Sequence, residues 1–156
     1  MTTETQLSCI EIEPDDTAQG TIIWLHGLGA SGHDFTPVAP HLGLSNIRFV
    51  FPHAPNLPVT INGGLVMPAW YDLRSIGPDP DRESEDDIRS SSALVQELID
   101  REVARGVPPS RIVLAGFSQG AGMALHVGLR QPEALAGLLI LSGYLVLPDK
   151  APSEWT

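Results

Sequence analysis

Ser118 stands between Gly116 and Gly120 in the stretch "LAGFSQGAG" (114–122). The pattern Gly-x-Ser-x-Gly is typical of a nucleophilic serine presented on a sharp turn between a strand and a helix. Such a serine takes a strained backbone conformation, and its neighbours two positions away must be small because they crowd the turn. The chemistry that this pattern indicates is attack by an activated hydroxyl on an acyl carbon. A polar residue in a plain structural turn is the alternative.

The elements around Ser118 favour the nucleophile. The apolar run "RIVLA" (111–115) is predicted to be a strand, and residues 119–130 a helix with small residues on its first turn. The motif alone is not rare, but this strand–turn–helix context is the one that it requires. The N-terminus of the helix would also favour an oxyanion.

Two backbone N–H groups are expected to bind that oxyanion. One belongs to Gln119, directly after the serine. The other is expected at Leu28, in the glycine-rich loop "HGLG" (26–29) that follows a predicted strand at 21–25. Glycines there would let the backbone come close to a ligand. An ordinary tight turn is the alternative for this loop.

Further apolar runs complete a coarse picture of the fold. Strands are predicted at 47–51 and 137–141, a helix from Ile88 to Val103 with Ser84 as N-cap, and a loop over 57–80. The acidic run at 79–87 is interpreted as the start of that helix; a metal loop is the alternative, although calcium-loop spacing is missing. Apolar strands that alternate with helices predict one α/β domain over residues 1–156, with a mostly parallel sheet and helices on both faces.

Composition narrows the class of protein. The net charge of −10 argues against nucleic acid or an anionic membrane surface as a partner. Cys9 is the only cysteine, so no internal disulfide can form. The N-terminal residues do not have the pattern of a signal peptide, and no apolar run is long enough to span a membrane. A cytoplasmic protein without a bound metal is the expectation.

Three long stretches carry a family resemblance: "WLHGLGASGHDF", "FPHAPNLPVTINGGLVMPAWYDL" and "RIVLAGFSQGAGMAL". From about residue 21 to 144 the chain resembles the phospholipase/carboxylesterase family of small α/β hydrolases, which includes carboxylesterases and acyl-protein thioesterases. The resemblance implies the α/β-hydrolase fold and hydrolysis of small esters or thioesters without a cofactor. It implies that Ser118 is the nucleophile and that Leu28 and Gln119 form the oxyanion hole. Met67 and Trp70 match the wall of an acyl-binding groove, with plain core packing as the alternative.

The remaining triad residues are missing from the expected order. In these hydrolases the serine is followed by an acid and then a histidine. After Ser118 the chain has only His126, and all three acids come later: Glu133, Asp149 and Glu154. His126 would lie about 12 Å along the helix from Ser118, too far for a general base. The sequence therefore predicts a C-terminally truncated, partial domain in which the strand at 137–141 has a bare edge.

Three interpretations stay open. The chain is a carboxylesterase or thioesterase whose acid and histidine come from a companion segment or from a homodimer formed at the bare edge. Alternatively, it is a catalytically inactive remnant that acts as a binding or dimerising module. The third interpretation is an unstable fragment. A phosphate-binding loop is weaker still, because the lysine of such a loop is missing.

Overall fold

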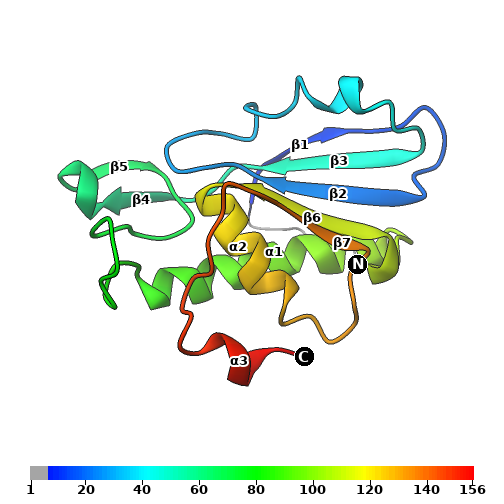
Figure 1. Cartoon of the computed structure of the whole chain (residues 1–156). Coiled ribbons are helices and arrows are strands. Elements are labelled where there is room, and N and C mark those ends of the chain that lie inside the picture. Colours follow the sequence, from blue (N-terminus) through cyan, green and yellow to red (C-terminus); the bar gives the residue numbers. More distant parts are fainter. Residues whose placement is uncertain (1–6) are drawn as a thin grey trace.

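The structure, a computed structural model, describes residues 7–156. Its centre is a five-stranded sheet in the order β1-β3-β2-β6-β7 (Figure 1). The four strands β3, β2, β6 and β7 run parallel, and β1 pairs antiparallel with β3. The parallel strands confirm the prediction from apolar runs, whereas β1 was missed because its alternating isoleucine and glutamate form no such run. The bounds are β1 Cys9–Ile12, β2 Gly20–Leu25, β3 Ile47–Pro52, β6 Ile112–Phe117 and β7 Gly137–Leu141.

The helices begin and end where local chemistry directs them. Helix α1 (Glu85–Ala104) has the predicted N-cap: the Ser84 hydroxyl accepts a 3.3 Å hydrogen bond from the Asp87 N–H. Helix α2 (Gln119–Gly128) follows β6 directly, and the short α3 (Ala151–Glu154) lies near the C-terminus. The last three acids of the run, Glu85, Asp86 and Asp87, therefore lie in the first turn of α1. Across residues 7–156, no group of three or more histidine, cysteine or acidic side chains could hold a metal ion.

Two apolar layers pack against the sheet. Helices α1 and α2 lie on the same face (Figure 1), and their buried side chains Val95, Leu98 and Met123 belong to the main core. Segment 26–46 covers part of the opposite face, where the Trp24 and Phe35 rings stack 5.0 Å apart. This segment has a 3-10 turn at Ala39–Leu42 rather than an α-helix. Pro37 and Pro40 each remove a backbone donor there.

The predicted loop at 57–80 is wrong in part. It contains an antiparallel hairpin of β4 (Asn56–Val59) and β5 (Leu65–Pro68), joined through a short 3-10 turn at Thr60–Asn62. Each strand has only four residues and includes a proline, so neither reads as a strand in the sequence. The end of β5 leads directly into the segment beneath the candidate site.

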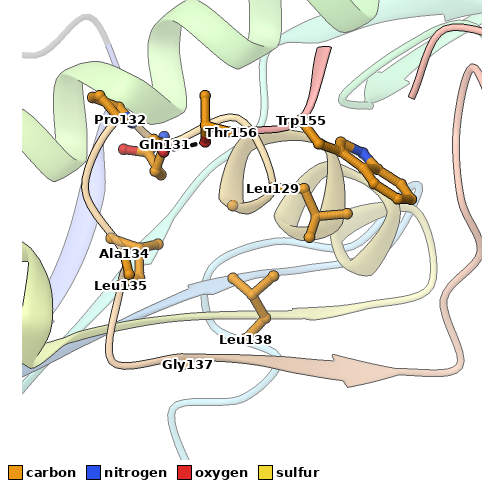
Figure 2. Close-up of a pocket in the computed structure, with 10 residues that line it drawn as sticks. Leu129, Gln131, Pro132, Ala134, Leu135, Gly137, Leu138, Trp155 and Thr156 are labelled. Atoms are coloured by element: carbon orange, nitrogen blue, oxygen red, sulfur yellow. Dashed lines mark hydrogen bonds between the residues drawn. The ribbon is translucent and has the colours of Figure 1, made fainter. Parts of the chain in front are cut away.

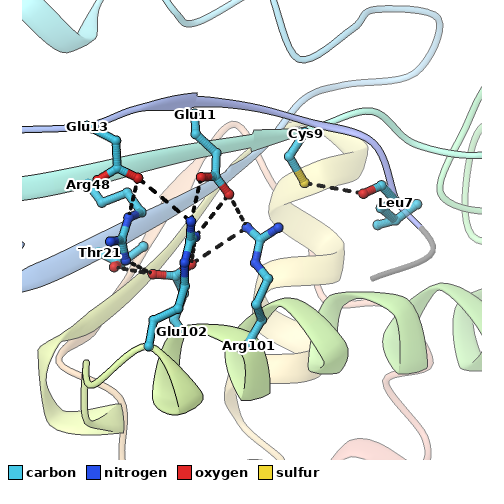
Figure 3. Close-up of polar contacts among 9 residues, drawn as sticks. Leu7, Cys9, Glu11, Glu13, Thr21, Arg48, Arg101 and Glu102 are labelled. Carbon is cyan, nitrogen blue, oxygen red and sulfur yellow. Dashed lines mark hydrogen bonds and ion pairs between the residues drawn. The ribbon is translucent and has the colours of Figure 1, made fainter. Parts of the chain in front are cut away.

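A buried ion network joins α1 to the sheet (Figure 3). Glu102 is fully buried and accepts hydrogen bonds from the Thr21 hydroxyl at 2.8 Å and from Arg48 at 2.6 Å. Arg105 binds the other oxygen of Glu102 at 2.8 Å and also pairs with Glu11 on β1. Thr21 lies near the amino end of β2, whereas Ser118 follows the carboxyl end of β6. The network and Ser118 therefore lie at opposite ends of the parallel strands.

Candidate active site

Ser118 occupies the turn between β6 and α2, as the motif predicts. Its φ of 55° and ψ of −117° form a conformation that costs a non-glycine residue about 1–3 kcal/mol. A Cβ atom at Gly116 would overlap the Gly120 carbonyl, and one at Gly120 would overlap the Leu25 carbonyl. The Ser118 N–H donates a 2.9 Å hydrogen bond to the Leu141 carbonyl at the end of β7. Packing thus explains the spacing of both glycines, and a neighbouring strand holds the strained turn.

Of the two predicted oxyanion donors, Gln119 lies in this turn and Leu28 lies in the loop that follows β2. Gln119 is the first residue of α2, so its N–H has no acceptor within the helix. The Leu28 N–H likewise has no hydrogen-bond acceptor in the part of the chain that the structure describes. The loop of Leu28 lies against the serine, because a Cβ atom at Gly27 would be 3.6 Å from the Ser118 Cβ. Free donors next to a presented hydroxyl suit a negatively charged tetrahedral intermediate.

Loop histidines do not serve Ser118. His26 is buried, and both ring nitrogens are engaged: Nδ1 with the Gly27 carbonyl at 2.7 Å and Nε2 with the Ala54 N–H at 3.0 Å. Burial lowers the pKa of His26, which keeps its ring neutral and structural. Of the other loop histidines, His53 accepts from the Gly32 N–H and His41 contacts the Pro37 carbonyl. His33 lies beside His53, with ring centroids 5.6 Å apart.

His126 is buried in the outer flank of α2. It is only 1% exposed, and it lines a cavity of about 240 Å³ together with Arg89 and Arg130. Burial, and then the charges of these arginines, lower its pKa to about 4. Within residues 7–156, the Ser118 hydroxyl has no hydrogen-bond partner among histidines or acids. The site therefore has a presented nucleophile and oxyanion donors, while the described residues supply no base.

His126 also predicts a dependence of stability on pH. Its folded pKa of about 4 lies below the ordinary 6.5, so the unfolded chain binds more protons between these values. Stability should therefore fall as pH drops from 6.5 toward 4, by about 1–3 kcal/mol from this group. We expect His126→Leu to lose that part of the fall when urea unfolding is measured at both ends of this window. The exposed His41→Leu serves as control, and an equal pH dependence in both variants would contradict the assignment.

The two candidate groove residues have different surroundings. Met67 on β5 is partly exposed, and its sulfur would lie 3.6 Å from a Cβ atom at Gly29, beside the oxyanion loop. Trp70 is fully buried, and its indole N–H donates a 2.8 Å hydrogen bond to the His26 carbonyl. Trp70 thus packs beneath the loop and has no exposed surface for a ligand. A ligand contact for Met67 stays a prediction.

Sequence reasoning missed the side chain of Gln119. It assigned a role only to the backbone N–H, since a polar residue on the first turn of a helix is usually exposed. In the structure this side chain is 3% exposed.

None of the helices within residues 7–156 is long and apolar enough to cross a bilayer.

Comparisons with known proteins show the family of the chain. A family model described as Phospholipase/Carboxylesterase matches residues 8–156. Acyl-protein thioesterase 1 of Schizosaccharomyces pombe is 44% identical over 149 residues, which are 95% of this chain and 66% of that protein. A thioesterase of the same name from Cryptococcus neoformans is 41% identical over 150 residues, 94% of this chain and 63% of the relative. The chain thus spans about two thirds of the length of these curated relatives.

Solved structures give the same fold. The crystal structure of Arabidopsis thaliana SOBER1 matches with a TM-score of 0.81 at 33% identity, over 88% of this chain and 68% of that one. The crystal structure of Zea mays acyl-protein thioesterase 2 matches with a TM-score of 0.79 at 27% identity, over 94% and 66% of the two chains. The sheet and its helices are those of an α/β hydrolase.

Proposed function

The chain belongs to the phospholipase/carboxylesterase family, and we propose that it hydrolyses carboxylic esters or acyl thioesters with Ser118 as nucleophile. The observation that carries this proposal is the strained conformation of Ser118 between two glycines that tolerate no side chain. Strain of this kind clusters at active sites. A cytoplasmic location, expected from composition, stays a prediction.

The mechanism follows from the arrangement at the turn. The Ser118 oxygen attacks the acyl carbon, and the carbonyl oxygen becomes an oxyanion that accepts hydrogen bonds from the Leu28 and Gln119 N–H groups. Collapse of the tetrahedral intermediate releases the alcohol or thiol and leaves an acyl-serine. Water then attacks the acyl-serine, the acid departs, and the serine hydroxyl is regenerated. A base must accept the serine proton and return it to the leaving group.

The base and its acid partner are proposed to come from outside this copy of the chain, from a second copy or from a companion segment. Strand β7 supports this, because among residues 7–156 it pairs only with β6, and Leu139 on it is 39% exposed. Residues 134–148 contain no charge that would block a further strand. Beside β7 lies a hollow of about 530 Å³ with apolar walls that include Leu129, Leu138 and Trp155 (Figure 2).

A binding or dimerising module without catalysis is the second candidate. The observation in its favour is the Ser118 hydroxyl itself, which has no base beside it within residues 7–156. Loss of the triad base typically lowers turnover by on the order of 10⁶, although an oxyanion hole alone leaves about 10³–10⁴ over water. Activity therefore separates the two candidates.

The test is hydrolysis of p-nitrophenyl butyrate by the chain and by Ser118→Ala, each over a series of chain concentrations. We expect turnover that is lost in Ser118→Ala and that rises per chain with concentration, because a second copy completes the site. Turnover that depends on Ser118 but is constant per chain would contradict completion by a second copy. Rates equal to those of Ser118→Ala at every concentration would contradict activity of this chain by itself and favour the binding module.

A further inference from the structure

The side-chain amide of Gln119 both accepts and donates a hydrogen bond, and both partners belong to one stretch of backbone. Its Oε1 accepts a hydrogen bond from the Trp70 N–H at 2.8 Å, and its Nε2 donates to the Tyr71 carbonyl at 2.8 Å. A backbone N–H only donates and a carbonyl only accepts, so this pairing fixes which end of the amide is the oxygen. With the side chain 3% exposed, both bonds are shielded from water. The start of α2 is thus tied to the segment 68–71.

The same segment holds the loop of Leu28 on both sides. The Pro68 carbonyl accepts a 2.8 Å hydrogen bond from the Gly29 N–H, and the Trp70 indole donates at 2.8 Å to the His26 carbonyl. Leu28 lies between these two anchored residues. The direction of its N–H is therefore set by the contacts that segment 68–71 makes.

We propose that the Gln119 amide and the Trp70 indole are positioning groups that hold the two oxyanion donors, the Leu28 and Gln119 N–H groups, at a fixed spacing. This rests on the proposed function, since the spacing matters for an oxyanion. Gly120 packs directly against the Leu25 and His26 carbonyls, and this packing limits how closely the start of α2 approaches the loop of Leu28. Such contacts have no direction, whereas hydrogen bonds orient the groups that make them.

The size of the effect follows from what one donor contributes. Removing one oxyanion donor costs about 10²–10³ in kcat, and a misplacement of about 1 Å costs up to about 10². Loss of the side-chain amide of Gln119 leaves the backbone N–H of Gln119 in place. The Leu28 N–H is then free to move. We therefore expect kcat to fall by about 10–100-fold with KM changed little.

The variant that tests this is Gln119→Met, which keeps the backbone N–H and the length of the side chain but removes both hydrogen bonds. Its matched control is Gln131→Met, just beyond the other end of α2. Gln131 is also buried, at 8% exposed, and donates to the Gln96 amide at 2.7 Å and to the Val127 carbonyl at 3.0 Å. Both variants lose a buried side-chain amide. The amide of Gln119 contacts segment 68–71, whereas the amide of Gln131 contacts Gln96 and Val127.

The first measurement is hydrogen exchange of the Gly29 amide and the Trp70 indole, followed by NMR, which requires no turnover. We expect exchange at both to be at least about 10-fold faster in Gln119→Met than in Gln131→Met. Equal exchange in the two variants would overturn the proposal, whether or not the chain hydrolyses esters.

The second measurement is the split between kcat and KM for p-nitrophenyl butyrate. A fall in kcat at constant KM in Gln119→Met, absent in Gln131→Met, supports the positioning role. Faster exchange with unchanged kcat would overturn it, because the donors would then be held by other contacts. Complete absence of turnover that depends on Ser118 would count against the proposed hydrolysis, and the exchange data would then decide the positioning claim.

Discussion

Replacement of Glu102 by glutamine is expected to lower the free energy of unfolding by about 2–3 kcal/mol. The carboxylate is fully buried, accepts hydrogen bonds from Arg48, Arg105 and the Thr21 hydroxyl, and also pairs with Arg101 at 3.6 Å. Glutamine has nearly the same shape but no charge, so Arg48 and Arg105 lose the buried carboxylate that they share and keep only the more exposed Glu13 and Glu11. A buried ion pair broken on one side is costly because the remaining charge stays poorly solvated.

The measurement is urea unfolding at pH 7, followed by tryptophan fluorescence, since the rings of Trp24 and Trp70 are both buried. Asp100→Asn on the same helix is the control, because within residues 7–156 the one hydrogen bond of this exposed carboxylate comes from the Gln96 side chain. We expect the control to change stability by less than about 0.5 kcal/mol. A loss below about 1 kcal/mol for Glu102→Gln would show that the arginines regain water in the variant.

The Glu102 network also has a pH signature. Burial raises the pKa of this carboxyl, but hydrogen bonds from the arginines and Thr21 outweigh burial, and the net pKa lies below the ordinary 4.5. A lowered carboxyl pKa contributes stability that is present above the unfolded value and is lost as pH falls through the folded value. Glu102→Gln should therefore flatten the decline of stability below about pH 4.5. The decline between pH 6.5 and 4.5, which comes from His126, should remain.

Replacement of Gly120 by alanine is expected to destabilise the fold by about 3 kcal/mol. The new methyl group would overlap the Leu25 and His26 carbonyls, which belong to backbone and cannot rotate away. Either α2 moves off the sheet or the strand β2 shifts. In both cases the Leu28 and Gln119 donors separate, so any turnover that depends on Ser118 should disappear as well.

Gly137→Ala is the matched control for this variant. A Cβ atom there meets nothing within 4 Å, and Gly137 is not among the residues with positive φ. We expect stability to change by less than about 1 kcal/mol, or to rise slightly because alanine restricts the unfolded chain. A Gly120→Ala protein as stable as Gly137→Ala would contradict the close packing of the serine turn against β2.

Local patterns predicted much of this fold. The parallel strands read as continuous apolar runs, and this pattern located β2, β3, β6 and the edge strand β7. Capping chemistry located the start of α1 at Ser84. The hairpin of β4 and β5 was missed because prolines and exposed apolar residues, such as Leu65 and Val66, hide its alternation.

The site was predictable only where its parts are local. Ser118 and the Gln119 N–H follow from five consecutive residues, and Leu28 from a loop after a strand. The Gln119 side chain binds a backbone 49 residues away, and Glu102 binds Thr21 across 81 residues. Such partners depend on how distant elements meet in space, which propensity and periodicity do not encode.

The order of strands in the sheet also matters during synthesis. Thr21 on β2 lies opposite Ile112 on β6, so the central strand waits for a partner made about 90 residues later. At about 5–20 residues per second, the ribosome needs roughly 5–20 s to reach it. Until then Ile23 and Leu25 have β3 on one side and no cover from α2, and contacts this distant form slowly. The half-made chain therefore exposes apolar surface of β2 for seconds before β6 and α2 cover it.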